Sequence, residues 1–205
     1  QTANAVVARR VYQLLRKHFS DLTIEIVVRK TVKLKKQTLY VLRIKDEQKL
    51  FLKQIHFFDG SNFLFSIPKE YEKNESMLIP YTQGLFLGTG SINNLQLSSY
   101  HLEISFAQEE HADDVMASLI PFDILFKKVK RRKAYLLYIK DSTMIGDFLA
   151  FVRAIKARFA FEDVRISRDM MNSMNRLINC EVANEQKSQK ATEQQINNIE
   201  FVQMK

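Results

Sequence analysis

The apolar residues of this chain recur with two different spacings, which predict helices and strands in a defined order. Over residues 5–19 they recur every three to four positions, which predicts an amphipathic helix capped by Asn4. Residues 23–30 and 39–45 alternate and are rich in β-branched and aromatic side chains, which predicts two strands. Residues 46–55 then predict a short helix that begins at an aspartate.

A second set of elements follows in the second half of the chain. The pattern predicts a strand, a helix, a two-stranded hairpin and a helix, at residues 99–107, 109–120, 124–130, 134–140 and 141–157. The side chains expected to face the core lie on one side of the strand and one face of the next helix: Leu102, Ile104, Phe106, Val115, Met116, Leu119 and Ile120. The order helix, strand, basic turn, strand, helix is therefore predicted twice.

The two copies are also similar in sequence. YVLRIKD at residues 40–46 resembles YLLYIKD at residues 135–141, an offset of 95 positions. A shared order of elements at a fixed offset indicates an internal duplication. At this offset the first helix and most of the first strand of the first copy would precede residue 1. We therefore expect the first copy to be incomplete and the chain to begin partway into a longer protein.

The segment between the copies, residues 81–93, is an apolar run that contains three glycines. It predicts a helix on which Gly84 and Gly88 share one face and leave room for another backbone to approach closely. Gly90 and Ser91 are expected to end this helix and to turn the chain toward the next strand. The rest of the chain is arranged around this segment.

The end of the chain has a different character. Residues 165–184 predict a helix in which apolar positions alternate with asparagine and arginine, residues 185–192 are polar, and helical spacing resumes at Ile196. We interpret this part as an extended helical arm or linker. The expected division is a first repeat at residues 1–70, a second repeat at residues 71–160 and the helical linker at residues 161–205.

Composition narrows the class of partner. The net charge is +8 and the sequence pI is near 9.5, which favours an anionic partner, with nucleic acid first and an acidic membrane surface second. No apolar run reaches the roughly 18 residues that a membrane span needs. The single cysteine, Cys180, excludes an internal disulfide and suits a reducing cytoplasm, and neither it nor the histidines show the paired spacing of zinc ligands.

The basic residues are concentrated in two turns at equivalent positions of the two copies. In a domain with pseudo-twofold symmetry these turns would lie symmetrically about one sheet surface, where they could follow a duplex backbone. The strands between them supply little base-reading chemistry apart from Arg29 and Arg43. The alternative is that both turns are solvated hairpin tips. The candidate phosphate contacts are Lys30, Lys33, Lys35, Lys36, Lys127, Lys128, Lys130, Arg131, Arg132 and Lys133.

These motifs resemble a known family. Residues 81–93 resemble a degenerate LAGLIDADG helix, the signature of homing endonucleases. More specifically, the runs GLFLGTGSIN, SSYHLEIS and FEDVRISRDMMNSMNRLINCEVAN resemble the WhiA family of bacterial regulators, and the similarity covers essentially the whole chain. The closing segment of that family is represented here by Asn172, Asn175, Arg176, Asn179, Cys180, Glu181, Ala183, Asn184 and Lys187.

The resemblance implies an α+β fold, in which a duplicated LAGLIDADG homing-endonuclease-like α/β domain with an incomplete first repeat is followed by a helical linker. It also implies a C-terminal helix-turn-helix, which we expect to be absent from this chain. The implied roles are in transcription linked to sporulation, in cell division and in chromosome segregation. The expected partners are double-stranded DNA and cell-division or transcription proteins, with no membrane and no small-molecule substrate. The expected location is the cytoplasm, in association with the nucleoid.

The resemblance does not extend to nuclease chemistry. Active LAGLIDADG enzymes hold a divalent metal with an acidic residue at the end of each motif helix. The matching position here is Thr89, which carries no charge, although Glu103 or Asp113 could in principle compensate. Ser91 and Cys180 lack the neighbours that activate a nucleophile. We therefore predict that the chain is not an enzyme and needs no metal or cofactor.

The sequence thus predicts a non-enzymatic, DNA-associated regulator whose domain adds nonspecific phosphate contacts or serves as a platform for a protein partner. A first alternative is a protein-interaction scaffold without DNA binding of its own, which predicts an exposed apolar patch and no salt-dependent DNA binding. A second alternative is a residual nuclease, which predicts converging carboxylates and Mg²⁺-dependent cleavage. A small-molecule sensor stays open, although no residue indicates its pocket.

Overall fold

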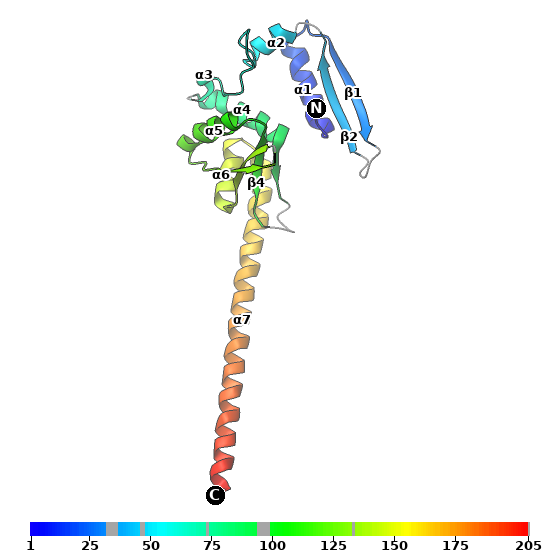
Figure 1. Cartoon of the computed structure of the whole chain (residues 1–205). Helices are drawn as coiled ribbons and strands as arrows, with labels where there is room; N and C mark the ends of the chain where they lie inside the picture. Colours follow the sequence, from blue (N-terminus) through cyan, green and yellow to red (C-terminus); the bar gives the residue numbers. More distant parts are fainter. Residues whose placement is uncertain (32–36, 46–47, 73, 94–98, 133, 205) are drawn as a thin grey trace. The chain divides into compact units, whose positions relative to one another are not determined.

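The computed structural model describes residues 1–31, 37–45, 48–72, 74–93, 99–132 and 134–204. The chain divides into two compact units, an α/β unit that extends to residue 154 and a helical unit that begins at Ile155 (Figure 1). Within the α/β unit, helices and strands follow one another in nearly the predicted order. The fold therefore belongs to the predicted α+β class.

The first copy consists of a helix, a β-hairpin and a short helix. Helix α1 (Ala5–His18) begins where predicted, because Oδ1 of Asn4 accepts hydrogen bonds from the first free N–H groups of the helix at 2.9 and 3.3 Å. Strands β1 (Ile24–Thr31) and β2 (Gln37–Ile44) pair antiparallel, and α2 (Gln48–Gln54) follows. The aspartate expected to begin α2 lies outside the described residues.

One face of this hairpin is directed toward α1. Tyr40, Leu42 and Ile44 of β2 line an apolar pocket of about 310 Å³ together with α1 residues that include Val11 and Leu15. Alternate residues of the same strands lie on the opposite face, because side chains of a strand alternate between its two sides. The hairpin therefore has an apolar face next to α1 and a second face that carries other side chains.

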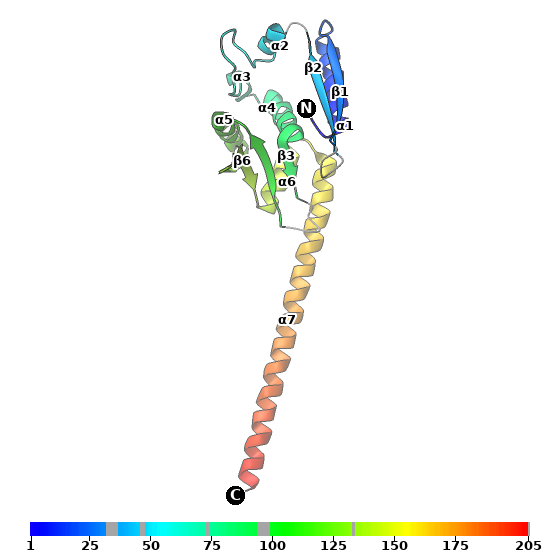
Figure 2. The same ribbon diagram turned by 45° about the vertical axis from the view of Figure 1, so that its right-hand side comes forward.

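The second copy contains a four-stranded antiparallel sheet with the strand order β3-β4-β6-β5 (Figures 1 and 2). Its strands are β3 (Gly90–Ile92), β4 (Leu102–Phe106), β5 (Lys127–Arg131) and β6 (Ala134–Ile139). Its helices are α3 (Lys69–Glu72), α4 (Glu75–Thr89), α5 (Glu109–Leu119) and α6 (Ser142–Phe151), and a short 3₁₀ turn, η1 (Ile120–Phe122), follows α5. The order β3-β4-β6-β5 makes β5 and β3 the two edges of the sheet.

The core of the α/β unit lies on one face of this sheet. Leu102, Ile104 and Phe106 are at most 3% exposed, as the alternation of β4 predicts. Phe148 of α6 is fully buried, and its ring contacts those of Phe86 and Phe126 edge-on at centroid distances of 5.4 and 5.6 Å. Burying a large aromatic side chain stabilises a fold by roughly 1.5–3 kcal/mol. This core fixes one face of the sheet.

Strand β3 corrects the prediction that Gly90 and Ser91 only turn the chain. Gly90 follows α4 directly and pairs with Ile104 of β4, so the chain passes from helix to strand without a loop (Figure 2). Gly90 has an extended backbone, with φ of −82°, and needs no left-handed conformation. It is suited to this position because a Cβ atom would overlap the ring and carbonyl oxygen of Phe86.

The other two glycines of α4 lie in open space. Apart from the chain neighbours and the nearby backbone of α4 itself, no heavy atom of the described residues lies within 4 Å of the position that a Cβ would take at Gly84 or Gly88. The described residues therefore contain no backbone that packs closely against this face of α4. The close approach that the two glycines would allow stays a prediction.

Two element ends differ from their predictions. Helix α5 ends at Leu119, and Ile120 is 52% exposed, so Ile120 does not face the core as predicted. Helix α6 begins at the predicted cap, where Oδ1 of Asp141 accepts from the N–H of Met144 at 2.9 Å, but it ends at Phe151. Arg153 has a left-handed φ of 55°, which ends the helix, whereas the predicted helix ran to residue 157.

The helical unit is a single helix, α7 (Ile155–Gln203), of 49 residues (Figure 1). The polar stretch at residues 185–192 is part of this helix. Most of its apolar side chains are exposed, among them Ile166, Met170 and Leu177. None of the helices in the described part of the chain combines the length and the apolarity that crossing a bilayer requires.

Candidate nucleic-acid interface

The basic residues of the second copy lie along a strand rather than at a turn. Lys127, Lys128, Lys130 and Arg131 all belong to β5, which forms one edge of the sheet and is exposed along its whole length. Arg132 follows at the tip with a left-handed φ of 57°. The alternation of a strand sends these side chains to two opposite faces, so they cannot all meet one partner.

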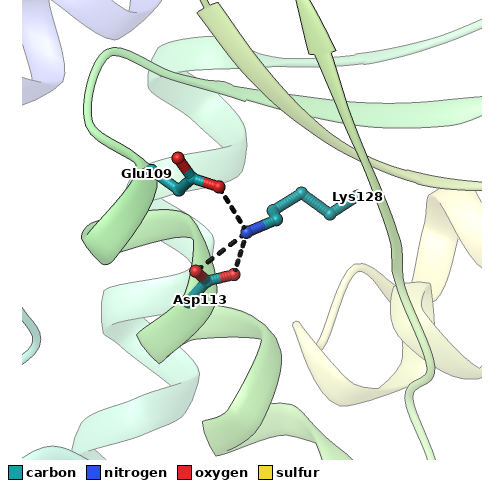
Figure 3. Close-up of polar contacts among 3 residues, drawn as sticks. All are labelled: Glu109, Asp113 and Lys128. Carbon is teal, nitrogen blue, oxygen red and sulfur yellow. Dashed lines mark hydrogen bonds and ion pairs between the residues drawn. The ribbon is translucent and has the colours of Figure 1, made fainter.

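Lys128 and Lys130 lie on the face that the helices cover. Paired residues of antiparallel strands share a face. Lys128 pairs with Leu137, which is fully buried, and Lys130 pairs with Tyr135. Figure 3 shows the Lys128 ammonium between the carboxylates of Glu109 and Asp113 of α5. Its Nζ donates to Oε1 of Glu109 at 2.9 Å and to the two oxygens of Asp113 at 2.6 and 2.8 Å.

These contacts change the acid–base behaviour of the group. Hydrogen bonds to Asp113 and then to Glu109 raise the pKa of Lys128, and the Lys128 ammonium holds the pKa of Glu109 below its usual range. Lys130 lies over the ring of Tyr135 at 5.1 Å, and this neighbour raises the pKa of Lys130. Lys128 in particular already has two anionic partners, so it is a poor candidate for a phosphate contact.

Replacing Lys128 by methionine should return the pKa of Glu109 toward its ordinary value of 4.5. A carboxyl whose pKa is lowered by folding stabilises the native state above its unfolded-state pKa, and this contribution is lost as the pH falls through the folded-state pKa. The stability difference between wild type and Lys128→Met should therefore disappear in acid. Carboxyl NMR titration of Glu109 in both proteins measures the shift; equal titration midpoints would contradict the contact.

The opposite, open face carries a row of four side chains that crosses every strand of the sheet. Ser91 pairs with Glu103, Glu103 pairs with Tyr138, and Tyr138 pairs with Lys127. Arg131 lies on the same face, because it and Lys127 are four residues apart on one strand. Within the described residues, neither Lys127 nor Arg131 forms an ion pair.

Two further groups on this face were not among the predicted contacts. Nζ of Lys140 lies over the ring of Tyr138 at 5.6 Å, and the ring of His101 stacks on Tyr138 at 5.8 Å with an interplanar angle of 27°. The alternation of YLLYIK already places Tyr138 and Lys140 on one side of β6. That signal was available in the sequence, but the position of His101 over the same ring depends on the pairing of β4 with β6.

The first copy carries an equivalent open face. Register pairs Glu25 with Arg43, Val27 with Val41 and Arg29 with Leu39, on the side opposite the residues directed toward α1. Both arginines are exposed. Lys30 lies on the other face, since it is one residue beyond Arg29. Lys33, Lys35, Lys36 and Lys133 lie outside the described residues, and their part in the interface stays a prediction.

Comparison with known proteins assigns these features to one family. The model of the WhiA N-terminal LAGLIDADG-like domain matches residues 1–58, that of the WhiA LAGLIDADG-like domain matches residues 79–171, and that of the WhiA C-terminal HTH domain matches residues 174–205. A probable cell division protein WhiA from Ligilactobacillus salivarius is 40% identical over 205 residues, which are 100% of this chain and 65% of that protein. The chain belongs to the WhiA family.

Other WhiA proteins support the same assignment. A probable cell division protein WhiA from Enterococcus faecalis is 41% identical over 203 residues, 99% of this chain and 65% of that protein. This chain therefore spans about 65% of the length of these curated relatives. A crystal structure of full-length WhiA from Thermatoga maritima has a TM-score of 0.61 at 21% identity and covers 81% of this chain and 51% of that one. A structure of the N-terminal LAGLIDADG domain of WhiA has a TM-score of 0.53 at 26% identity, with 75% of this chain and 67% of that one covered.

The WhiA comparisons confirm the predicted duplicated LAGLIDADG-like fold and correct one expectation. We expected no part of the helix-turn-helix in this chain, but the model of that WhiA domain matches residues 174–205. In the structure, residues 174–203 are part of α7. The predicted linker at residues 161–205 therefore overlaps the residues that match the helix-turn-helix domain of WhiA proteins.

The motif residues of the closing WhiA segment are exposed along α7. Most of them are three or four positions from another member and form a wide band along the helix, whereas Glu181 lies on the side opposite Asn172. Within the band, Nδ2 of Asn184 donates to Sγ of Cys180 at 3.8 Å. This band is available to a partner on its whole length, and its role stays a prediction. Its members are Asn172, Asn175, Arg176, Asn179, Cys180, Glu181, Asn184 and Lys187.

The acidic residues that could restore LAGLIDADG nuclease chemistry do not converge. Thr89, at the end of the motif helix, is exposed, and its Oγ1 donates to the carbonyl of Leu85 at 3.3 Å. Glu103 lies on the open face of the sheet, whereas Asp113 binds Lys128 on the covered face. In the described part of the chain, no three or more His, Cys, Asp and Glu side chains gather as a metal site would require. Glu103 and Asp113 therefore lie on opposite faces of the sheet and cannot bind one metal ion together.

Proposed function

We propose that this chain acts as a DNA-binding WhiA regulator, and that the open faces of the two sheets in its LAGLIDADG-like region contact the phosphates of duplex DNA without cleaving it. The observation that carries the proposal is the row of side chains across the second sheet, which ends in Lys127 at an exposed edge with Arg131 beside it. Lysine and arginine side chains without carboxylate partners are the groups that replace counterions on DNA.

The proposed contacts give affinity and position but little sequence reading. Phosphate contacts carry no sequence information directly, whereas reading bases needs donors and acceptors that reach into a groove. On the first hairpin, Arg29 and Arg43 are the groups able to do this. The helix-turn-helix that WhiA proteins carry would supply the sequence-specific contacts, and the α/β unit would hold the complex on the duplex.

The cellular role follows from the relatives. These relatives are named as probable cell division proteins. We extend this to the present chain as a DNA-associated role in cell division, transcription and chromosome segregation, at the nucleoid in the cytoplasm. Glu103 and Asp113 lie on opposite faces of the sheet, which supports the proposal that the domain is not a nuclease.

A salt titration tests the proposal. The chain is titrated with a fluorescent duplex at a series of salt concentrations from about 0.05 to 0.2 M, and log K is plotted against log salt. Each phosphate contact should contribute a slope of about −0.9, so several contacts should give a steep line. Incubation with Mg²⁺ should leave the duplex uncut. An absence of binding at the lowest salt would contradict the proposal, and cleavage would support the residual-nuclease alternative.

One observation favours a protein-interaction scaffold as the second candidate. Phe57, Phe63 and Phe65 are 39–55% exposed, and Phe57 contacts the other two rings at centroid distances of 5.8 and 5.9 Å. Exposed apolar clusters of this kind occur at protein interaction sites. The same titration separates the candidates, because a scaffold without DNA binding would give no salt-dependent signal.

A further inference from the structure

Glu103 places a negative charge in the middle of the proposed DNA-binding face. It belongs to the row that ends in Lys127, on the central strand β4, two strands away from that lysine. Two strand spacings correspond to roughly 10 Å, which is about the screening length at 0.1 M salt. A duplex that contacts Lys127 and Arg131 would therefore bring its phosphates within electrostatic range of this carboxylate.

The carboxylate is held in place by neighbours on both sides. The Ser91 hydroxyl on β3 donates to Oε1 of Glu103 at 3.4 Å. Nε2 of His101 lies 3.1 Å from Oε2, and since a carboxylate only accepts, the imidazole donates. The His101 ring stacks on Tyr138, which is itself beside Lys140. Glu103 is thus oriented on the face by Ser91 of the adjacent strand β3 and by His101 of its own segment, and is not a freely moving surface side chain.

No lysine or arginine neutralises this charge in the described part of the chain. The other acidic residues found in ion pairs are each paired with a fixed cation: Glu25 with Lys45, Glu109 and Asp113 with Lys128, and Glu162 with Arg165. Within the described residues, the only basic side chain that contacts Glu103 is His101, which is charged only when it is protonated. Its side chain is 29% exposed, so its field reaches the solvent on the open face.

We propose that Glu103 restrains the affinity of the open face for duplex DNA. This inference rests on the proposed function. A carboxylate near the phosphates opposes the attraction of Lys127 and Arg131, which weakens sequence-independent binding. Competing nonspecific sites outnumber specific ones by many orders of magnitude in a genome. A restraint on the nonspecific surface leaves more of the protein free for the sites that a sequence-reading domain selects.

The substitution Glu103→Gln tests this proposal, with Glu110→Gln as the matched control. Glutamine keeps the shape and can still accept from Ser91 and His101, but it removes the charge. Glu110 is exposed on α5, which packs on the opposite face of the sheet, so its replacement changes the net charge equally without altering the open face. Duplex affinity is measured for the wild type and both variants near 0.1 M salt.

We expect Glu103→Gln to bind duplex about twofold more tightly than the wild type, because one like-charge interaction across roughly 10 Å of water is removed. Glu110→Gln should stay within about 1.3-fold of the wild type, because its charge lies on the other side of the sheet and is screened. Unfolding midpoints are compared to verify that both variants fold alike.

Other results would overturn the inference, and they differ from a failure of the proposed function. Unchanged or weaker binding by Glu103→Gln, while the wild type binds, would mean that Glu103 does not oppose DNA. Equal gains in both variants would assign the effect to net charge alone. If neither the wild type nor Glu103→Gln binds duplex at low salt, the proposed function itself fails together with the restraint.

Discussion

Replacing Lys127 and Arg131 together by alanine should lower duplex affinity by about 60-fold near 0.1 M salt. Each phosphate contact contributes a slope of about 0.9 in log K against log salt, so two contacts amount to roughly 1.8 log units between 0.1 and 1 M. Both side chains lie on the open face and have no ion-pair partner among the described residues. The salt slope of the variant should be shallower by about two. Fluorescence anisotropy at several salt concentrations measures both quantities.

The matched control is the double replacement of Lys128 and Lys130 by alanine. It removes the same charge from the same strand, but from side chains directed toward the covered face. We expect its affinity to stay within about threefold of the wild type, since Lys128 is already bound by two carboxylates and distant charges are screened. An equal loss in both double variants would show that total charge, rather than the open face, determines binding.

Replacing Phe148 by alanine should lower the free energy of unfolding of the α/β unit by about 3–5 kcal/mol. The side chain is fully buried, and its edge-on contacts with Phe86 and Phe126 join α6 to α4 and to the segment that leads into β5. The substitution removes these ring contacts and leaves a cavity that the surrounding helices and strand cannot fill completely. Urea unfolding followed by tyrosine fluorescence measures the change, because the chain contains no tryptophan.

The exposed ring of Phe159 offers the comparison. It lies on α7 and is 66% exposed, so Phe159→Ala should change the free energy of unfolding by no more than about 0.5 kcal/mol. A loss below about 1 kcal/mol for Phe148→Ala would mean that the core around α6 repacks freely. In that case the position of β5, and with it the open face, would not depend on this residue.

Much of the fold could be predicted because its signals are local. Side-chain oxygens of Asn4 and Asp141 accept from the first N–H groups of α1 and α6, and such caps are visible in the sequence. The alternation of Leu102, Ile104 and Phe106 identified the buried face of β4. The repeated YVLRIKD and YLLYIKD segments located β2 and β6.

The remaining features depend on contacts between distant residues. Strand β3 is only three residues long and begins with a glycine, so its pairing with β4 has no local signal. The end of α6 at Arg153 uses a left-handed residue other than glycine, which sequence patterns do not distinguish from helix. Lys128 was counted with the phosphate contacts because the carboxylates of α5 that bind it are 15 and 19 residues away.

The charged side chains of β5 also oppose aggregation through this exposed edge strand. An exposed edge strand offers unpaired N–H and C=O groups to the strands of other molecules, and lysine side chains are a common means of preventing such pairing. Four of the five residues of β5 are lysine or arginine, and the strand is exposed along its length. A mutation that made this strand apolar to weaken the proposed DNA binding would at the same time create a surface prone to edge-to-edge aggregation. Selection against insolubility and selection for the proposed DNA contacts would therefore favour the same residues here.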